Sequence, residues 1–83
     1  MSVDLQVLTN TAVETGTSPF FRGGSAVFVN FTAGSLIVQG SDDNGVDDAY
    51  ATYVTVPAGG MIKGTDLPAW IKVSTAATVY VLA

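Results

Sequence analysis

Residues Ser25–Gly40 read SAVFVNFTAGSLIVQG, and this stretch decides the fold class. Both of its ends are rich in β-branched and aromatic residues, which suit a pleated strand. Between them lies a three-residue turn, 32–34, that ends in glycine, as is typical of a β-hairpin. The stretch therefore predicts two strands, Ser25–Phe31 and Ser35–Gly40, that pair as a hairpin.

The same pattern of short β-type runs continues toward both ends of the chain. Nine glycines and three prolines interrupt it, and they leave little room for helices. The further predicted strands are Val3–Leu8, Ala49–Val56, Met61–Lys63, Ala69–Ser74 and Thr78–Leu82. Residues 1–83 are thus expected to form a single all-β domain. We expect a compact antiparallel β-sandwich or a jelly-roll-like barrel of about seven short strands.

The N-terminal third is the least regular part. Residues 9–17 suit either a strand or an extended arm, and residues 17–24 (TSPFFRGG) are the most loop-like. We therefore expect residues 1–24 as an N-terminal arm on a β core of residues 25–83.

The balance of apolar and charged residues points toward burial against another chain. Of the 83 residues, 48% are apolar and 12% are charged. In Ser25–Phe31 and Ser35–Gly40, both alternating sets of residues include large apolar side chains. A sheet with one solvated face shows cleaner alternation, so another subunit is expected to cover the outer face. The alternative is ordinary apolar surface, which every protein has.

Composition also excludes several function classes. The chain has no cysteine and no histidine, and so lacks disulfides, thiolate metal ligands and the commonest general base. Its net charge is −4, with Arg22, Lys63 and Lys72 as the only basic residues, which disfavours binding to nucleic acid or an anionic membrane. We expect no enzyme activity, no catalytic residue, no cofactor and no metal. Residues 1–6 lack the features of a secretory signal, so synthesis in the cytoplasm is expected.

An acidic segment is the most conspicuous local feature. It contains Asp42, Asp43, Asn44, Asp47 and Asp48. Clustered oxygen ligands suit Ca²⁺, but the spacing does not match an EF-hand loop. The prediction is an exposed hairpin loop in which Asn44-Gly45 takes a positive φ, and a Ca²⁺ site is the alternative.

Aromatic residues are expected mainly as core or interface anchors. Adjacent Phe20 and Phe21 cannot both enter one sheet core, so together with Arg22 they are predicted to contact another chain. The alternative is a loop folded back over the core. The strip Val3, Leu5 and Val7 is predicted as a second contact with a subunit or partner.

Three stretches carry a resemblance to a known family. They are Gly34–Asp43 (GSLIVQGSDD), Tyr53–Gly60 (YVTVPAGG) and Leu67–Ala83 (LPAWIKVSTAATVYVLA). Residues 34–83 resemble the small all-β capsid decoration, or cement, proteins of tailed bacteriophages. The resemblance implies a homotrimer or dimer on the capsid exterior that locks major capsid proteins together, and we expect a trimer. Rival hypotheses are a phage tail, baseplate or head-fibre module, and a carbohydrate-binding module that uses an exposed Trp70.

Overall fold

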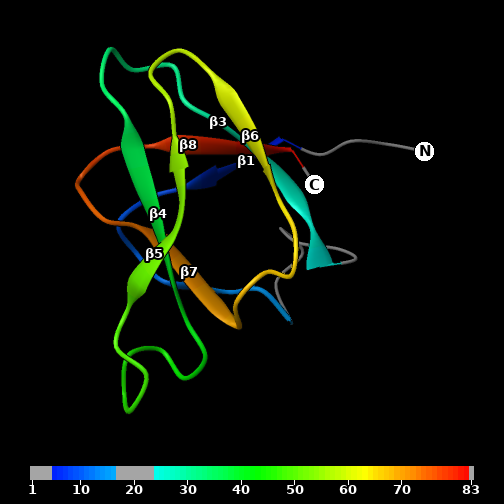
Figure 1. Cartoon of the computed structure of the whole chain (residues 1–83), viewed down its shortest axis with the longest axis vertical. Coiled ribbons are helices and arrows are strands. Elements are labelled where there is room, and N and C mark those ends of the chain that lie inside the picture. Colours follow the sequence, from blue (N-terminus) through cyan, green and yellow to red (C-terminus); the bar gives the residue numbers. More distant parts are fainter. Residues whose placement is uncertain (1–4, 17–23, 83) are drawn as a thin grey trace.

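The structure is a computed structural model that describes residues 5–16 and 24–82. Eight short strands and no helix occur in these residues (Figure 1). The strands are β1 (Leu5–Leu8), β2 (Val13–Glu14), β3 (Ala26–Val29), β4 (Leu36–Ser41), β5 (Ala51–Val56), β6 (Met61–Gly64), β7 (Trp70–Val73) and β8 (Val79–Leu82). The all-β prediction is confirmed. In the part described, no helix has the length and hydropathy needed to cross a membrane.

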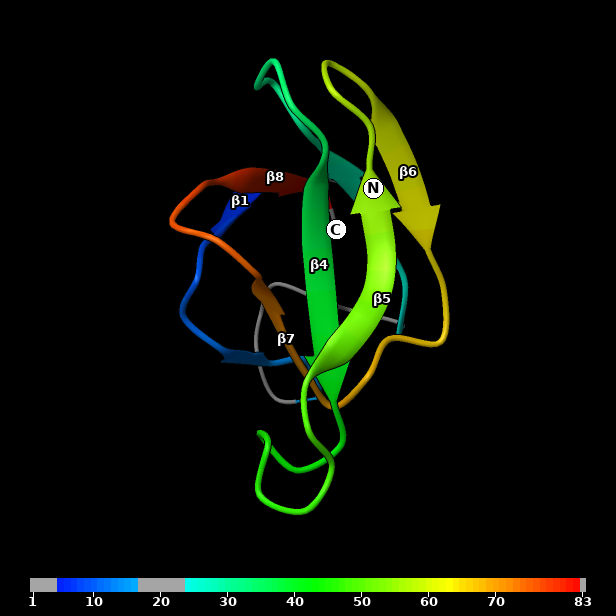
Figure 2. The ribbon, with the colours of Figure 1, turned by 60° about the vertical axis from the view of Figure 1, so that its left-hand side comes forward.

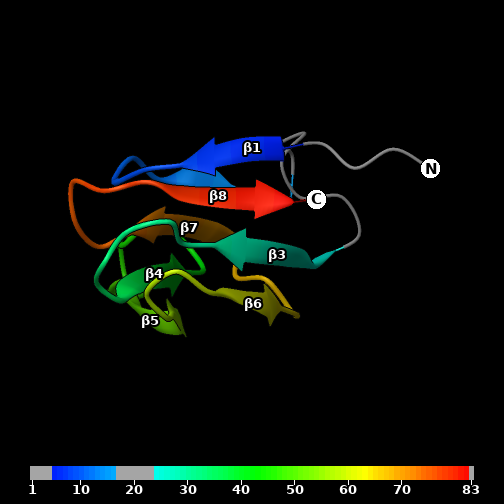
Figure 3. The same cartoon turned by 90° about the horizontal axis from the view of Figure 1, so that it is seen from above.

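The strands form two four-stranded antiparallel sheets that pack as a sandwich. Sheet A has the order β1-β8-β3-β6, and sheet B has the order β2-β7-β4-β5. Figure 3 shows the four strands of sheet A side by side in this order. Among the described strands, only β4 and β5 are both consecutive in the chain and paired with each other. Every other connection between these strands passes from one sheet to the other.

The predicted hairpin of Ser25–Phe31 with Ser35–Gly40 is therefore wrong. Strand β3 pairs with β6 and β8 in sheet A, whereas β4 pairs with β5 and β7 in sheet B. Gly34 does not take the positive φ that the hairpin loop required. Figure 2 shows the connection from β3 to β4 passing over the top of the sandwich.

Asn30 provides the physical reason for this crossing. Its side chain is fully buried, and its Nδ2 donates to the carbonyl oxygens of Gly34 at 2.8 Å and of Val56 at 3.1 Å. Its Oδ1 accepts hydrogen bonds from the backbone and the hydroxyl of Thr32. One amide thus shapes the connection and ties it to the end of β5, which belongs to the other sheet.

The core lies between the sheets and includes side chains from both. Its buried apolar residues are Leu8, Ala26, Phe28, Val38, Val56, Ile71, Val73, Val79 and Val81. Of the described residues, no buried side-chain nitrogen or oxygen lacks a hydrogen-bond partner.

The expectation of an arm needs correction for residues 5–16. Strand β1 pairs along its whole length with β8, and β2 pairs with β7. Leu8 is fully buried in the core, and the Thr15 hydroxyl donates to the carbonyl oxygens of Pro68 and Ala69. This part of the chain belongs to the sandwich because it completes both sheets and supplies core volume.

Candidate functional site

The outer face of sheet A consists of two rows of side chains that run across all four strands. The first row is Val7, Tyr80, Val29 and Met61. The second row is Leu5, Leu82, Val27 and Lys63. Cross-strand partners lie on the same side of a sheet, so seven apolar or aromatic side chains and one lysine share this face. With Phe31, which follows β3, these residues form what we call the apolar face.

Several residues of the apolar face are widely open to solvent. The exposed fraction is 74% for Phe31, 65% for Met61, 61% for Leu5 and 44% for Val7. The ring of Phe31 packs edge to face on Tyr80, with 5.2 Å between ring centroids. These neighbouring exposed apolar side chains make the face a candidate interaction surface.

Two of the residues predicted for contact, Leu5 and Val7, lie on the apolar face. Val3, Phe20, Phe21 and Arg22 were also predicted for contact and lie outside the described residues. Sequence reasoning did not assign Met61, Tyr80 or Leu82 to a contact surface. The alternation of residues 79–82 signalled that one set faces outward, but which strands are neighbours was not readable.

The outer face of sheet B is polar by comparison. Its cross-strand neighbours are Glu14 with Trp70, then Lys72 with Gln39 and Thr52, then Ile37 with Thr55. Charged, amide and hydroxyl groups therefore dominate this side, as expected of a sheet face in contact with water.

The acidic segment is the loop of the β4–β5 hairpin and extends beyond the sandwich (Figure 1). Asn44 has φ of 60° and Gly45 has φ of 80°, so the predicted Asn-Gly turn is confirmed. A Cβ on Gly45 would also lie 3.2 Å from the Tyr50 ring, which leaves little space for a larger residue.

Asp43 organises this loop. Its carboxylate accepts hydrogen bonds from the backbone N–H groups of Val46, Asp47 and Asp48, at distances between 2.8 and 3.2 Å. These bonds, with that of Asp47 the most important, hold the pKa of Asp43 below its ordinary value. The negative charge at the loop tip is thus stabilised by the loop's own backbone.

Other polar groups attach the loop to sheet B. The buried Ser41 hydroxyl donates to the carbonyl oxygen of Asp48 and accepts from the backbone N–H of Gly45. Tyr50 donates to Asn44 Oδ1 at 2.6 Å, and the Lys72 ammonium lies 4.6 Å from the Tyr50 ring centroid. Burial, and then the charge of Asp43, raise the pKa of Tyr50. The loop is ordered by protein contacts.

The aspartates do not converge on a metal site. Within residues 5–16 and 24–82, no group of three or more His, Cys, Asp or Glu side chains is placed to hold a metal ion. The carboxylates of Asp43 and Asp48 instead accept backbone N–H groups of the loop. In the described loop, these carboxylates are therefore engaged with the loop's own backbone.

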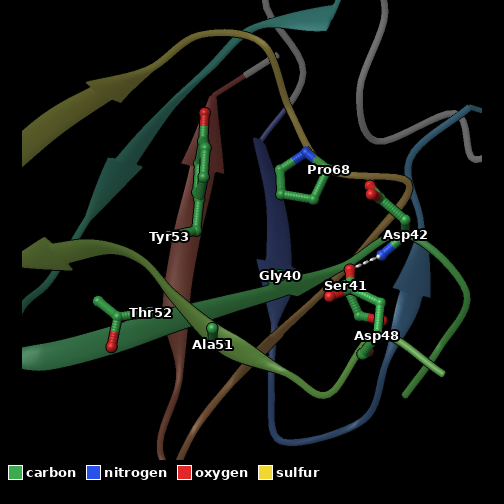
Figure 4. A pocket seen from close by; sticks show the side chains of 8 residues that line it. All are labelled: Gly40, Ser41, Asp42, Asp48, Ala51, Thr52, Tyr53 and Pro68. Carbon is green, nitrogen blue, oxygen red and sulfur yellow. Dashed lines mark hydrogen bonds between the residues drawn. The ribbon is translucent and has the colours of Figure 1, made fainter. Parts of the chain in front are cut away.

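A small hollow of about 200 Å³ lies beside the base of the loop (Figure 4). It is lined by Gly40, Ser41, Asp42, Asp48, Ala51, Thr52, Tyr53 and Pro68. Pro68 packs directly over Gly40, where an added Cβ would lie 2.3 Å from the proline ring. Pockets for typical small-molecule ligands measure about 300–1,000 Å³, so this hollow is small for such a ligand.

Trp70 lies beside Glu14 on the outer face of sheet B and is half-buried. A stacking platform for a sugar ring needs one open face of an aromatic ring. Trp70 thus offers only part of its surface for such a contact.

Comparisons of the chain with protein-family models, with curated proteins and with solved structures find no match. The resemblance of residues 34–83 to phage decoration proteins therefore stays a prediction.

Proposed function

We propose that this chain is a structural virion protein that binds the outside of a phage capsid and bridges major capsid proteins. The observation that carries this proposal is the apolar face of sheet A, which is suited to contact with another protein subunit, either a capsid subunit or a second copy of the chain. The proposal includes no catalytic activity, no cofactor, and no binding to nucleic acid or membrane.

The fold supports the proposal, but the fold alone does not identify the function. The strand orders β1-β8-β3-β6 and β2-β7-β4-β5 support assignment to the jelly rolls, which include viral capsid and lectin domains. One fold serves many functions, so the argument for decoration also relies on the resemblance of residues 34–83.

The distribution of polar groups suits a particle surface. In the proposed arrangement, the ordered acidic loop points away from the capsid, and its charge keeps finished particles soluble and mutually repelling. Many copies on a symmetric lattice convert modest single-site affinity into avidity. A homotrimer matches a three-fold capsomer junction, and each contact that bridges capsid subunits opposes the pressure of packaged DNA.

The test uses purified chain and capsids that lack it, prepared from the phage that encodes the chain. We expect the chain to co-sediment with these capsids in a fixed ratio and to raise the temperature at which they break. Electron microscopy of the complexes should show added density over the capsomer junctions. Val46→Ser, a change at a loop residue that is 78% exposed, is the control and should bind equally. Failure of the native chain to bind at any concentration overturns the proposal.

The same experiment separates the rival functions. Density on tails, baseplates or head fibres of complete virions assigns the chain to those parts instead. A carbohydrate-binding module is the second candidate, because part of the Trp70 ring is exposed beside Glu14. In that case, tryptophan fluorescence changes on addition of a bacterial surface polysaccharide, and Trp70→Ala abolishes polysaccharide binding measured by calorimetry.

A further inference from the structure

We infer that the apolar face of sheet A is the surface through which copies of this chain associate with one another. This inference rests on the proposed function only in its assumption of self-association. What the inference adds is the surface that mediates self-association, which the sequence did not specify. It holds for the purified protein, whichever part of a particle the chain binds.

The first argument is charge. None of the described carboxylates belongs to the two rows of the apolar face: Glu14 lies on the outer face of sheet B, Asp42, Asp43, Asp47 and Asp48 lie in the hairpin loop, and Asp66 lies between β6 and β7. The chain carries a net charge of −4, so two copies repel each other wherever these carboxylates meet. On the apolar face, Lys63 is the only charged side chain among the described residues.

The second argument is self-complementarity. In a contact between identical faces, each patch must fit its own copy. The apolar face would meet its own copy with Lys63 as its one described charged residue, whereas the outer face of sheet B would bring Glu14 and Lys72 together with several amide and hydroxyl groups. The first row also brings aromatic and thioether side chains, Tyr80 and Met61, to the contact, and both kinds are enriched at protein interfaces.

The third argument is area, and it sets the strength of association. Four strands about 4.8 Å apart and four residues of about 3.4 Å each give a flat footprint of roughly 250 Å² per copy. Two copies would therefore bury at least about 500 Å², whereas stable interfaces bury roughly 1,200–2,000 Å². Association through this face alone should be weak and reversible.

The experiment is sedimentation velocity on the full chain from about 1 μM to 1 mM, with the mass checked by light scattering. We expect the mass to rise with concentration from that of one chain, 8.5 kDa, toward two or three times this value. The variant Met61→Glu places a carboxylate on the face at a residue that is 65% exposed. We expect it to raise the dissociation constant by at least about tenfold, because burying a carboxylate in an apolar contact costs its hydration.

The matched control is Ile37→Glu, a change at an apolar residue on the outer face of sheet B that is 37% exposed. It adds the same charge and should associate much more strongly than Met61→Glu. Phe31→Ser, at the margin of the face, is a second variant should Met61→Glu fold poorly, as judged by circular dichroism.

A chain that remains a monomer at 1 mM overturns the inference. So does equal association of Met61→Glu and Ile37→Glu, since another surface must then be responsible. Capsid binding is measured separately, so a monomer that still binds capsids refutes this inference and leaves the proposed function standing. A chain that self-associates through this face but does not bind capsids supports this inference and refutes the proposed function.

Discussion

The two sheets share one core and have the same number of strands, yet their outer faces differ. Across sheet A, the outward residues are apolar in both rows except for Lys63. Across sheet B, charged, amide and hydroxyl side chains prevail, with Ile37 and Trp70 as the exceptions. Strand alternation places side chains on the outside in both sheets, but only sheet B has an outer face suited to water.

The strands of sheet A are apolar on their outward side as well as on the side that faces the core. In β3, the inward residues Ala26 and Phe28 supply the core, and the outward residues Val27 and Val29 are apolar as well. Strands that are apolar on both sides are typical of sheets covered on both faces. Leaving apolar surface in water forgoes about 25 cal/mol per Å², so the outer face of sheet A gains stability when another surface covers it.

The largest difference in stability is expected between variants at inward-facing and outward-facing residues of one strand, β3. Phe28→Ala removes a fully buried ring from the core and should lower the free energy of unfolding by about 3–5 kcal/mol. Val27→Ala, its neighbour on the apolar face, should cost less than about 1 kcal/mol in the monomer. Urea unfolding at a few micromolar measures both. Equal costs would mean that the apolar face is already buried under these conditions.

The next largest loss of stability is expected for a change at Asn30, in the connection from β3 to β4 that links the two sheets. Asn30→Ala removes two donated and two accepted hydrogen bonds at a fully buried position, which should cost roughly 2–3 kcal/mol. The control is Asn10→Ala, because Asn10 also donates to a carbonyl, that of Val73, but is itself exposed. Its cost in thermal or urea unfolding should be about 1 kcal/mol or less. A similar loss for both variants would contradict the bridging role of Asn30.

A smaller effect is expected at a close contact in sheet B. Gly40→Ala forces a methyl group against the Pro68 ring, which should cost about 1–3 kcal/mol through overpacking. Gly34→Ala is the matched change, because an added Cβ there meets nothing within 4 Å and the backbone lacks a positive φ. It should leave the unfolding midpoint nearly unchanged. If both variants melt together, Pro68 moves aside freely and the contact does not constrain sheet B.

The smallest effect expected is a dependence of stability on pH that arises from Asp43. Since folding lowers the pKa of Asp43, its contribution to stability is present above the unfolded value of 3.8 and is lost as the pH falls below that value. The backbone amide signals of Val46, Asp47 and Asp48 should shift together in an NMR titration from pH 6 to pH 2. Asp43→Asn should abolish this shared transition. Its persistence in the variant would assign the transition to another carboxylate.

The sequence predicted most strands because their signal is local. Runs of β-branched and aromatic residues between glycines, prolines and polar turns placed seven of the eight strands close to their observed positions. Strand β2 is only two residues long, too short for alternation to show. The acidic hairpin loop was predicted because Asn44-Gly45 specifies its own backbone conformation. The hairpin of residues 25–40 failed because a short loop with glycine is compatible with a crossing between sheets as well.

The amino-acid sequence alone determined the all-β class, the positions of most strands, the turn at Asn44-Gly45 and the presence of apolar residues on both sides of β3. Each of these depends on neighbours within a few residues. Only the tertiary structure decided that β1 pairs with β8, that Leu8 enters the core and that the apolar face belongs to one sheet. Those outcomes depend on contacts between opposite ends of the chain, such as Leu5 with Leu82. Such pairings are selected by the joint packing of all eight strands, and a local pattern does not encode them.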